Sequence, residues 1–487
     1  MKKLIYILGI GFLAISSCQK KVTDIAQPDV LSPELIFDTP DRMEAAVSGA
    51  YDGLQSANFL SGRALIYVDL MGEDVVDKNL FFGDLPRFAM LANNGIPGGV
   101  WNAAYNAIAR ANRVADGINA NLDKIDATRA KELVAECRFV RAVAHFYLVN
   151  FFAQPYNFTA DGSHTGVPVI TETFTSNDPA ANKPRASVKE VYDAVIADLN
   201  AALTDLPIDQ ADTYTSKTRA TKAAAAALLS RVYLYKGDYA NAKTMAGNII
   251  NGQYGAFALN ASPAGVFGPG NYETDETIWS IPNNVSDNPN TNNALPQHYA
   301  EAGRGDIAVS PTFMNVATNP YFTADDKRRN MIVAATLGSN AGYFYTTKYP
   351  DVATRADWAP IIRYAEVLLT YAEATARLAA GVDADALAKL NQVRNRSIVS
   401  APAYVAGDFA DKDELVDAIL GERRIELAFE GHRFFDLGRI KSGVVNKLDG
   451  DFSPIADQPF GANKSIFPIP QTEVEKSQGV LVQNAGY

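Results

Sequence analysis

Apolar residues recur at helical spacing along most of this chain, which predicts a mainly α-helical protein. Across residues 127–152 they return every three or four positions, so one face of a single long helix is apolar. Ser187 and Glu190 form a capping box at the start of another helix, and Pro207 ends that helix. The same periodicity predicts further helices at 44–54, 101–118, 360–378, 385–397 and 414–430.

Residues 220–250 show a more specific pattern. Two apolar helices are joined there by residues 236–239, which include Gly237, and the small residues Ala226 and Ala242 are spaced as in a tetratricopeptide repeat. Helical pairs before and after this unit favour the stacking of several such units. The expected fold is therefore a tetratricopeptide-like scaffold of helical pairs with large irregular loop insertions.

Two stretches lack a sustained helical period and are rich in glycine, proline, asparagine and aromatic residues. They cover about residues 80–100 and 251–360, and irregular segments of this length inside a compact protein are usually functional. Within the second stretch, Trp279 lies in an alternating segment that is typical of a strand in the core. No linker composition divides the chain, so residues 18–487 are predicted to form a single domain.

Residues 1–17 are expected to be a processing signal rather than part of the fold. Lys2 and Lys3 precede an apolar run over residues 4–15, which is shorter than the about 20 residues that a membrane-spanning helix needs. The run ends in two serines before Cys18, a sequence that resembles the lipobox of bacterial lipoproteins. Cys18 is then the expected lipid-bearing first residue of the mature chain. An ordinary secretory leader that contains a cysteine is the alternative.

The charge balance and the missing motifs narrow the function. The formal net charge is -11, which argues against nucleic acid as the main partner. The chain contains no P-loop, dinucleotide-binding fingerprint, His-Glu-x-x-His, Cys-x-x-Cys or Gly-x-Ser-x-Gly motif. Only four histidines occur, and Cys137 is the single cysteine left in the mature chain. Catalysis is therefore disfavoured, and we predict no catalytic centre, no cofactor and no metal ion.

Two clusters of charged residues are expected to lie in solvent. Glu73, Asp74 and Asp77 are predicted to form a solvated acidic turn, with a cation site as the alternative. Residues 325–329, of sequence Asp-Asp-Lys-Arg-Arg, are predicted to be a surface charge cluster. Residues 304–306 resemble an Arg-Gly-Asp adhesion tripeptide, but three residues carry almost no specificity.

The densest charge lies in residues 422–439. Glu422, Glu426 and Glu430 are four residues apart and form one acidic stripe on a helix. Like charges at this spacing destabilise an isolated helix by about 0.2–0.5 kcal/mol per pair. Arginines within the stretch or on neighbouring helices are expected to offset that repulsion. We predict a structural ion network rather than a catalytic site.

The same stretch, ERRIELAFEGHRFFDLGR, resembles the C-terminal signature of the RagB/SusD family of outer-membrane nutrient-binding lipoproteins. Segments 362–374, 390–396 and 467–487 support the resemblance in order and spacing, so it spans essentially the whole mature chain. It implies a SusD-like fold, lipid-anchored to the outer membrane and facing the cell exterior. Some exported lipoproteins carry acidic residues just after the lipid-bearing cysteine, whereas Gln19, Lys20 and Lys21 follow here.

The resemblance also implies a ligand and a partner. The protein would bind an oligosaccharide or polysaccharide and deliver it to a SusC-type TonB-dependent transporter in the outer membrane. Capture of peptides or another nutrient by the same scaffold is the alternative. Two rivals come from other classes: a glycosidase using paired carboxylates among Glu73, Asp74 and Asp306, and an adaptor whose helical repeats hold a partner protein.

Aromatic side chains in the loops are the candidates for ligand binding. Their planes stack on the apolar C–H faces of sugar rings, while asparagine, aspartate and arginine bind the hydroxyls. In glycan-binding relatives the ligand contacts come from loops before an early helix and from the central insertion. Packing in the core is the alternative for each of the candidates, which are Phe81, Phe82, Arg87, Trp101, His298, Tyr299, Tyr343 and Tyr345.

Overall fold

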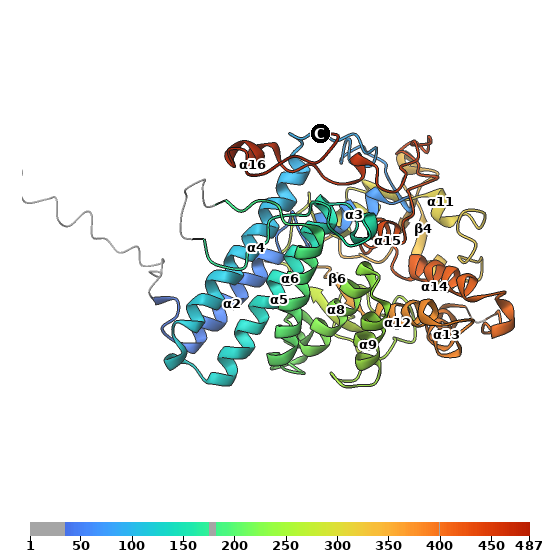
Figure 1. Ribbon diagram of the computed structural model, residues 1–487. Helices are drawn as coiled ribbons and strands as arrows, with labels where there is room; N and C mark the ends of the chain where they lie inside the picture. Colours follow the sequence, from blue (N-terminus) through green and yellow to red (C-terminus); the bar gives the residue numbers. More distant parts are fainter. Residues whose placement is uncertain (1–34, 175–181, 399) are drawn as a thin grey trace, which may run out of the picture.

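Helices dominate the structure. The computed structural model describes residues 35–174, 182–398 and 400–487 (Figure 1). The predicted mainly α-helical fold is confirmed, whereas the predicted leader and Cys18 lie outside the described residues. Within the described ranges, no helix is both long and apolar enough to cross a membrane.

The elements follow one another along the chain with long irregular connections. The helices are α2 (Pro40–Leu54), α3 (Arg63–Met71), α4 (Gly95–Asn119), α5 (Ala127–Phe152), α6 (Val188–Asp205), α7 (Thr213–Thr218), α8 (Lys222–Lys236), α9 (Tyr239–Ile250), α10 (Leu295–Tyr299), α11 (Pro311–Met314), α12 (Tyr364–Leu378), α13 (Ala384–Ser397), α14 (Lys412–Glu426), α15 (Arg433–Arg439) and α16 (Gln471–Lys476). The strands are β1 (Val75–Asp77), β2 (Thr277–Ile281), β3 (Ile307–Val309), β4 (Ile332–Ala334), β5 (Phe344–Thr346) and β6 (Ala359–Arg363).

The helices pack side by side in chain order. Helices α2, α4, α5 and α6 form one group in Figure 1, and α8, α9 and α12 continue the array toward α13 and α14. The predicted hairpin over 220–250 is confirmed: α8 ends at Gly237, whose φ of 78° is left-handed, and α9 follows at once. The predicted capping box of α6 is also present, with Ser187 and Glu190 bonding each other's backbone.

Several predicted helices have different ends in the structure, among them the one predicted at 101–118, which begins at Gly95. Two further differences have a clear cause. The helix expected at 360–378 begins at Tyr364, because residues 359–363 pair as β6 with β2 instead. The helix expected to end at residue 430 stops at Glu426, since Phe429 and Gly431 adopt left-handed φ values of 67° and 76°. In both places, tertiary pairing or a turn overrides the apolar period.

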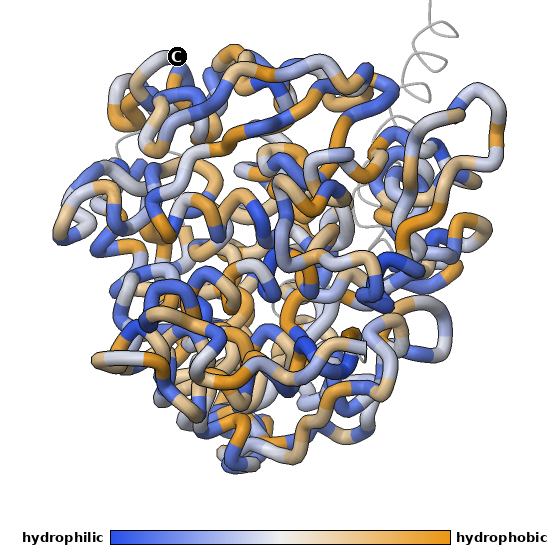
Figure 2. Tube along the Cα trace, turned by 90° about the vertical axis from the view of Figure 1, so that its right-hand side faces the viewer, coloured by the Kyte–Doolittle hydropathy of each residue, from blue (hydrophilic) through white to orange (hydrophobic). Residues whose placement is uncertain are grey.

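The described residues form three two-stranded antiparallel sheets, two of which connect segments that are far apart in sequence. They pair β1 with β3, β2 with β6, and β4 with β5. Trp279 of β2 is buried as predicted, and its Nε1 donates to the Thr218 carbonyl at 3.1 Å. One large hydrophobic cluster joins residues from Met43 to Ile469, and Figure 2 shows apolar and polar positions interleaved along the whole trace.

Glu422 and Glu426 of α14 and Glu430, which lies beyond its end, belong to a buried ion network, so the predicted stripe on one helix holds only for the first two. Arg328 Nη1 donates to Glu422 at 2.6 Å and to Glu426 at 3.0 Å. Arg363 and Lys348 both bond Glu430, at 2.7 and 2.6 Å, and their charges lower its pKa although burial opposes this. The predicted structural network is therefore confirmed, but its cations come largely from outside α14, from residues 328, 348, 363 and 396.

The prediction of a surface charge cluster at residues 325–329 is wrong for Asp326 and Arg328, whereas Asp325 and Lys327 are exposed as predicted. Asp326 and Arg328 are buried, and their side chains bond each other at 2.6 Å. The sequence shows the charge run but not its partners, which lie about 100 residues further along on α14. A buried cation is stable here because three carboxylates surround it.

Candidate ligand-binding surface

Strand β1 places the first aromatic loop beside the central insertion. Val75 to Asp77 pair with Ile307 to Val309 of β3, so the loop that follows β1 begins next to the segment that precedes β3. Several side chains from these segments and from two further loops contact one another in series. We call this set the Phe81 surface: Arg63, Lys78, Asn79, Phe81, Asn292, Arg304, Tyr343 and Phe452.

Asp77 fixes the loop that carries the aromatic pair. Its Oδ1 accepts the N–H of Phe81 at 3.0 Å and its Oδ2 accepts the N–H of Phe82 at 2.7 Å. Burial raises the pKa of Asp77 to about 6 against these hydrogen bonds. Leu80, just before the pair, adopts a left-handed φ of 55°.

The two phenylalanines occupy different environments. Phe82 is buried and packs edge-on against Phe81, with ring centroids 5.0 Å apart. Phe81 is half-buried and keeps part of its ring in solvent. His298 lies behind both rings, at 5.3 and 5.1 Å, and is fully buried. Phe81 is therefore the ring that a ligand can reach, and the other two support it.

Asp306 is the polar centre beneath Phe81. It accepts hydrogen bonds from His298 Nδ1 at 2.9 Å, from Arg304 Nε at 2.7 Å and from Asn79 Nδ2 at 3.0 Å. Although burial by itself raises the pKa of Asp306, these bonds outweigh it and lower the pKa to about 2. The carboxylate is thus ionised, and its bonds hold the Asn79 and Arg304 side chains in place.

Tyr343 forms the second aromatic position. Its ring lies 4.7 Å from the ring of Phe452, and its hydroxyl donates to the Gly450 carbonyl at 2.7 Å. The Lys78 ammonium lies 5.3 Å from the centre of the same ring. Tyr343 and Phe452 are half-buried, so both present an edge or face to solvent while they hold each other rigid.

Two other predicted residues lie close to this surface but have structural partners. Arg87 forms a bidentate ion pair with Asp449, at 2.7 and 3.0 Å. Tyr345 is buried against Val76 and Ala308, and its hydroxyl lies 3.4 Å from the Gly305 carbonyl. Both side chains support the loops of the Phe81 surface, and their role as ligand contacts stays a prediction.

Tyr299 and Trp101 belong to the core packing. Tyr299 is buried, and its hydroxyl donates to Asp69, which also accepts the N–H of Gly431 at 3.0 Å. Trp101 is 4% exposed and packs at 5.0 Å against Phe152. It also lines a hollow of about 350 Å³ near α16, which shares no lining residue with the Phe81 surface. The structure does not bring these two side chains together with Phe81.

Sequence reasoning missed Arg63, Asn79, Asn292 and Phe452, and it passed over Lys78 and Arg304. Arg63 begins α3 and reaches Phe81 across 18 positions, with its guanidinium 5.2 Å from the ring centre. Arg304 stands 4.2 Å from the same centre. Only the tertiary pairing of β1 with β3 shows that these residues meet, although the loop location of Asn79 beside Phe81 was a usable signal.

The predicted solvated acidic turn is wrong. Glu73 and Asp74 are buried and bond the guanidinium groups of Arg433 and Arg424, at 3.0 and 2.9 Å. Asp77 is also buried, with its oxygens turned to backbone N–H groups. In the part of the chain that the structure describes, no group of three or more acidic, histidine or cysteine residues is arranged to hold a metal ion.

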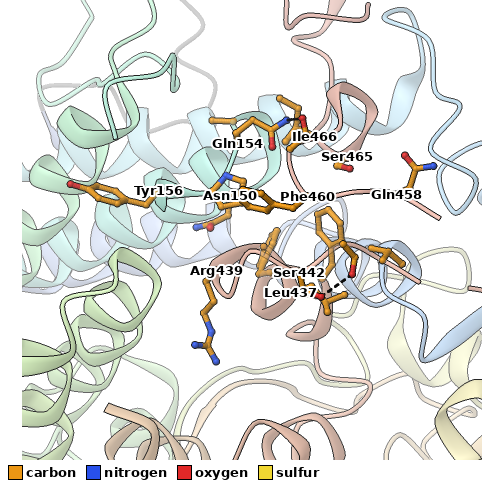
Figure 3. Close-up of a pocket in the computed structure, with 18 of the residues that line it drawn as sticks. Asn150, Gln154, Tyr156, Leu437, Arg439, Ser442, Gln458, Phe460, Ser465 and Ile466 are labelled. Carbon is orange, nitrogen blue, oxygen red and sulfur yellow. Dashed lines mark hydrogen bonds between the residues drawn. The ribbon is translucent and has the colours of Figure 1, made fainter. Parts of the chain in front are cut away.

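The best-enclosed cavity is too small for a sugar. Figure 3 shows the side chains that surround it, among them Asn150, Gln154, Tyr156, Arg439 and Phe460, from the end of α5, from α15 and from residues 458–466. Its volume of about 40 Å³ holds a few waters at most, whereas small-molecule pockets measure about 300–1,000 Å³. This cavity therefore cannot hold a glycan, whereas the more open hollow beside Trp101, of about 350 Å³, falls within that size range.

Family models match both halves of this chain. A model described as "Starch-binding associating with outer membrane" matches residues 27–234, and one described as "SusD family" matches residues 324–487. A SusD-like protein of Formosa agariphila is 28% identical, and the match covers 94% of this chain and 95% of that protein. A second SusD-like protein of the same organism is 24% identical over 90% and 91%.

Solved structures give the same result. A SusD superfamily protein from Bacteroides fragilis has a TM-score of 0.79 at 27% identity, covering 91% of this chain and 99% of that one. A putative sugar binding protein from Bacteroides vulgatus has a TM-score of 0.76 at 27% identity, covering 92% and 99%.

Fold and sequence together define an outer-membrane-associated class of binding proteins. The chain belongs to the SusD/RagB family. Members of this family are carbohydrate-binding proteins and not enzymes, so the prediction of a non-enzymatic protein is confirmed by family membership.

Proposed function

We propose that this protein captures an oligosaccharide or polysaccharide at the Phe81 surface. The observation that carries the proposal is the pair of half-exposed rings, Phe81 and Tyr343, set on a rigid base with amide and cationic groups between them. Aromatic planes suit the C–H faces of sugars, and Asn79 and Asn292 are exposed amides that suit the hydroxyls. The family description and the Bacteroides vulgatus neighbour support a carbohydrate ligand.

The rigidity of the Phe81 surface makes it a better candidate for ligand binding than a loop that lacks such hydrogen bonds. Asp77 and Asp306 together accept five hydrogen bonds from the loop, from His298 and from two side chains of the surface itself. A preorganised surface loses little conformational entropy when a ligand binds, so more of the contact energy appears as affinity.

The binding role extends to delivery. In this proposal Cys18 carries the lipid that anchors the protein in the outer membrane with the Phe81 surface outward, and the captured glycan passes to a SusC-type TonB-dependent transporter. The family description, which places its members at the outer membrane, supports the location. No bond of the ligand is made or broken in this process.

Calorimetry on the purified mature protein tests the ligand class. A panel of plant, algal and host oligosaccharides is titrated beside a matched pool of peptides. We expect saturable binding to at least one glycan and none to the peptides. Binding to peptides alone would show that the protein captures the alternative class of nutrient. Turnover of a bound glycan would contradict the proposal that the protein only binds its ligand.

Anchoring and partnership need separate experiments in cells. Cys18→Ser should abolish metabolic labelling with palmitate and release the protein from the membrane fraction. The wild-type protein should co-purify from detergent extracts with a TonB-dependent transporter. Membrane retention of Cys18→Ser would contradict the lipid anchor, and failure to recover any transporter would contradict the partnership.

A further inference from the structure

Two cationic side chains on the Phe81 surface have no carboxylate partner in the described ranges. Arg63 donates from Nε and Nη2 to the Asn292 carbonyl, at 3.2 and 2.8 Å, and from Nη1 to the Tyr67 hydroxyl at 3.3 Å. Lys78 donates to the Asn79 side chain at 3.1 Å. All of these acceptors are neutral, so both positive charges remain uncompensated by an ion pair within 4.0 Å.

A third cation stands beside them. Arg304 shares the Asp306 carboxylate with His298, and its side chain is 30% exposed. Its Nη1 donates to the Asn292 side chain at 3.2 Å, so Arg63 and Arg304 meet at one asparagine. Both guanidinium groups also lie against the Phe81 ring, at 5.2 and 4.2 Å from its centre. The ring is thus flanked by two forks of N–H donors.

The positive charges of the Phe81 surface contrast with the rest of the molecule. The whole chain has a formal net charge of -11, and most of its buried cations are paired with carboxylates. Asp306 compensates the charge of Arg304 beneath Phe81, and Asp451 lies on the Tyr343 side of the surface with its carboxylate bonded to Ser453. Arg63 and Lys78 are therefore the two charges of the Phe81 surface that remain without an ion pair in the described ranges. Charges more than about 8 Å away are screened at physiological salt, so an arriving ligand senses the local cations.

We propose that the glycan bound here carries an acidic group, which sits between Arg63 and Arg304 at the edge of Phe81. A carboxylate of a uronic acid and a sulfate ester share the planar or forked oxygen geometry that guanidinium groups bind best. Lys78 supplies a third charge toward Tyr343. The inference rests on the proposed glycan-binding function and adds the substrate class to it.

A purely structural role for Arg63 does not explain why this position carries a positive charge. A brace to the Asn292 carbonyl needs a donor but no charge, and a neutral glutamine would supply it. Placing two guanidinium groups beside one half-exposed ring costs desolvation energy. The two groups also repel each other, because they carry like charges. An acidic substituent offsets that repulsion when the ligand binds.

The test uses glycans in matched pairs. Uronate-containing and sulfated oligosaccharides are titrated beside the same molecules after carboxyl reduction or desulfation. We expect the protein to bind an acidic member at least about tenfold more tightly than its neutral counterpart, with an affinity that falls as salt rises. Comparison of the carboxyl-reduced and desulfated pairs distinguishes the two sources of negative charge.

Single substitutions test whether the preference for acidic glycans arises at the Phe81 surface. Arg63→Gln, which keeps a donor for Asn292, should remove most of the preference for the acidic member, and Arg63→Lys should restore part of it. Arg110→Gln is the charge-matched control, because Arg110 pairs with Asp52 on the helical array. Melting curves exclude unfolding as the cause.

Three outcomes separate the inference from the proposed function. A preference for acidic glycans that Arg63→Gln abolishes supports both. Equal affinity for the acidic and neutral members, or tightest binding to a neutral glycan, overturns the inference and leaves the proposed function standing. Absence of binding to every glycan in the panel overturns the proposed function and the inference with it.

Discussion

Arg424 donates from Nε to Asp74 Oδ1 at 2.9 Å, although the two residues are 350 positions apart in the sequence. Arg424 belongs to α14, and Asp74 immediately precedes β1. Arg433 bonds the neighbouring Glu73 at 3.0 Å. The charge-dense C-terminal segment is therefore tied directly to the strand that ends at Asp77, from which the Phe81 loop begins. The ion network positions the candidate surface without taking part in it.

Arg424→Gln is expected to destabilise the protein by about 3–5 kcal/mol, because it leaves the buried carboxylate of Asp74 with only Arg433, whose Nε is 3.9 Å away. Burial already raises the pKa of Asp74. A raised carboxyl pKa favours the protonated folded state at low pH, so the loss should be larger at pH 8 than at pH 5. Urea unfolding at both values measures it. Arg110→Gln, at an exposed pair, should change the stability by less than about 0.5 kcal/mol.

Glu426→Ala should lower both stability and expression. Glu426 accepts hydrogen bonds from Arg328, Arg363 and Arg396, so its removal leaves three buried guanidinium groups facing one another. The expected loss is at least about 3 kcal/mol, measured by thermal or urea unfolding. The soluble fraction should keep the ligand preference of the wild type, and Arg433→Ala should behave in the same way. An unchanged melting temperature with lost ligand affinity would contradict the structural role of the network.

Trp101→Ala distinguishes packing from ligand contact at that position. The side chain is packed against Phe152 and Tyr105, so its removal should cost about 3–5 kcal/mol of stability. Glycan affinity of the folded variant should stay within about twofold of wild type, because the hollow that it lines shares no residue with the Phe81 surface. A tenfold loss of affinity at unchanged stability would instead support the sequence-based prediction of a ligand contact.

The low pKa of Asp306 predicts acid sensitivity. Its folded pKa of about 2 lies below the ordinary value of 3.8. The stabilisation from its ionised form is therefore present above pH 4 and is lost as the pH falls toward 2. The urea midpoint of wild type should fall across this range more steeply than that of Asp306→Asn. Parallel profiles for the two proteins would show that the carboxylate is not stabilised by His298, Arg304 and Asn79.

Local chemistry was readable in the sequence where neighbours in the chain decide the structure. The Ser187–Glu190 capping box and the Gly237 hairpin depend on residues three or four apart, and both are present as predicted. Cys137, the single cysteine left in the mature chain, is buried in α5. Glu422, Glu426 and Glu430 were also correctly assigned to a structural network.

The features that sequence reasoning missed depend on contacts between residues that are far apart in the chain. Burial of Glu73 depends on Arg433, which is 360 positions away. Phe81 and Phe82 are adjacent and chemically identical, yet the left-handed turn at Leu80 and the bonds to Asp77 leave only Phe81 accessible. Arg63 and Arg304 look like ordinary surface cations until both are placed against that ring.

Phe81→Ala tests the central claim most directly, since this ring is the accessible aromatic that both guanidinium groups flank. Calorimetry with the best glycan of the panel should show a loss of affinity of about tenfold or more, and melting curves check that the variant is folded. Phe158→Ala, at a ring that is 44% exposed and contacts His164 and Phe460, is the matched control and should bind like wild type. Wild-type affinity in Phe81→Ala would contradict the assignment of ligand binding to this surface.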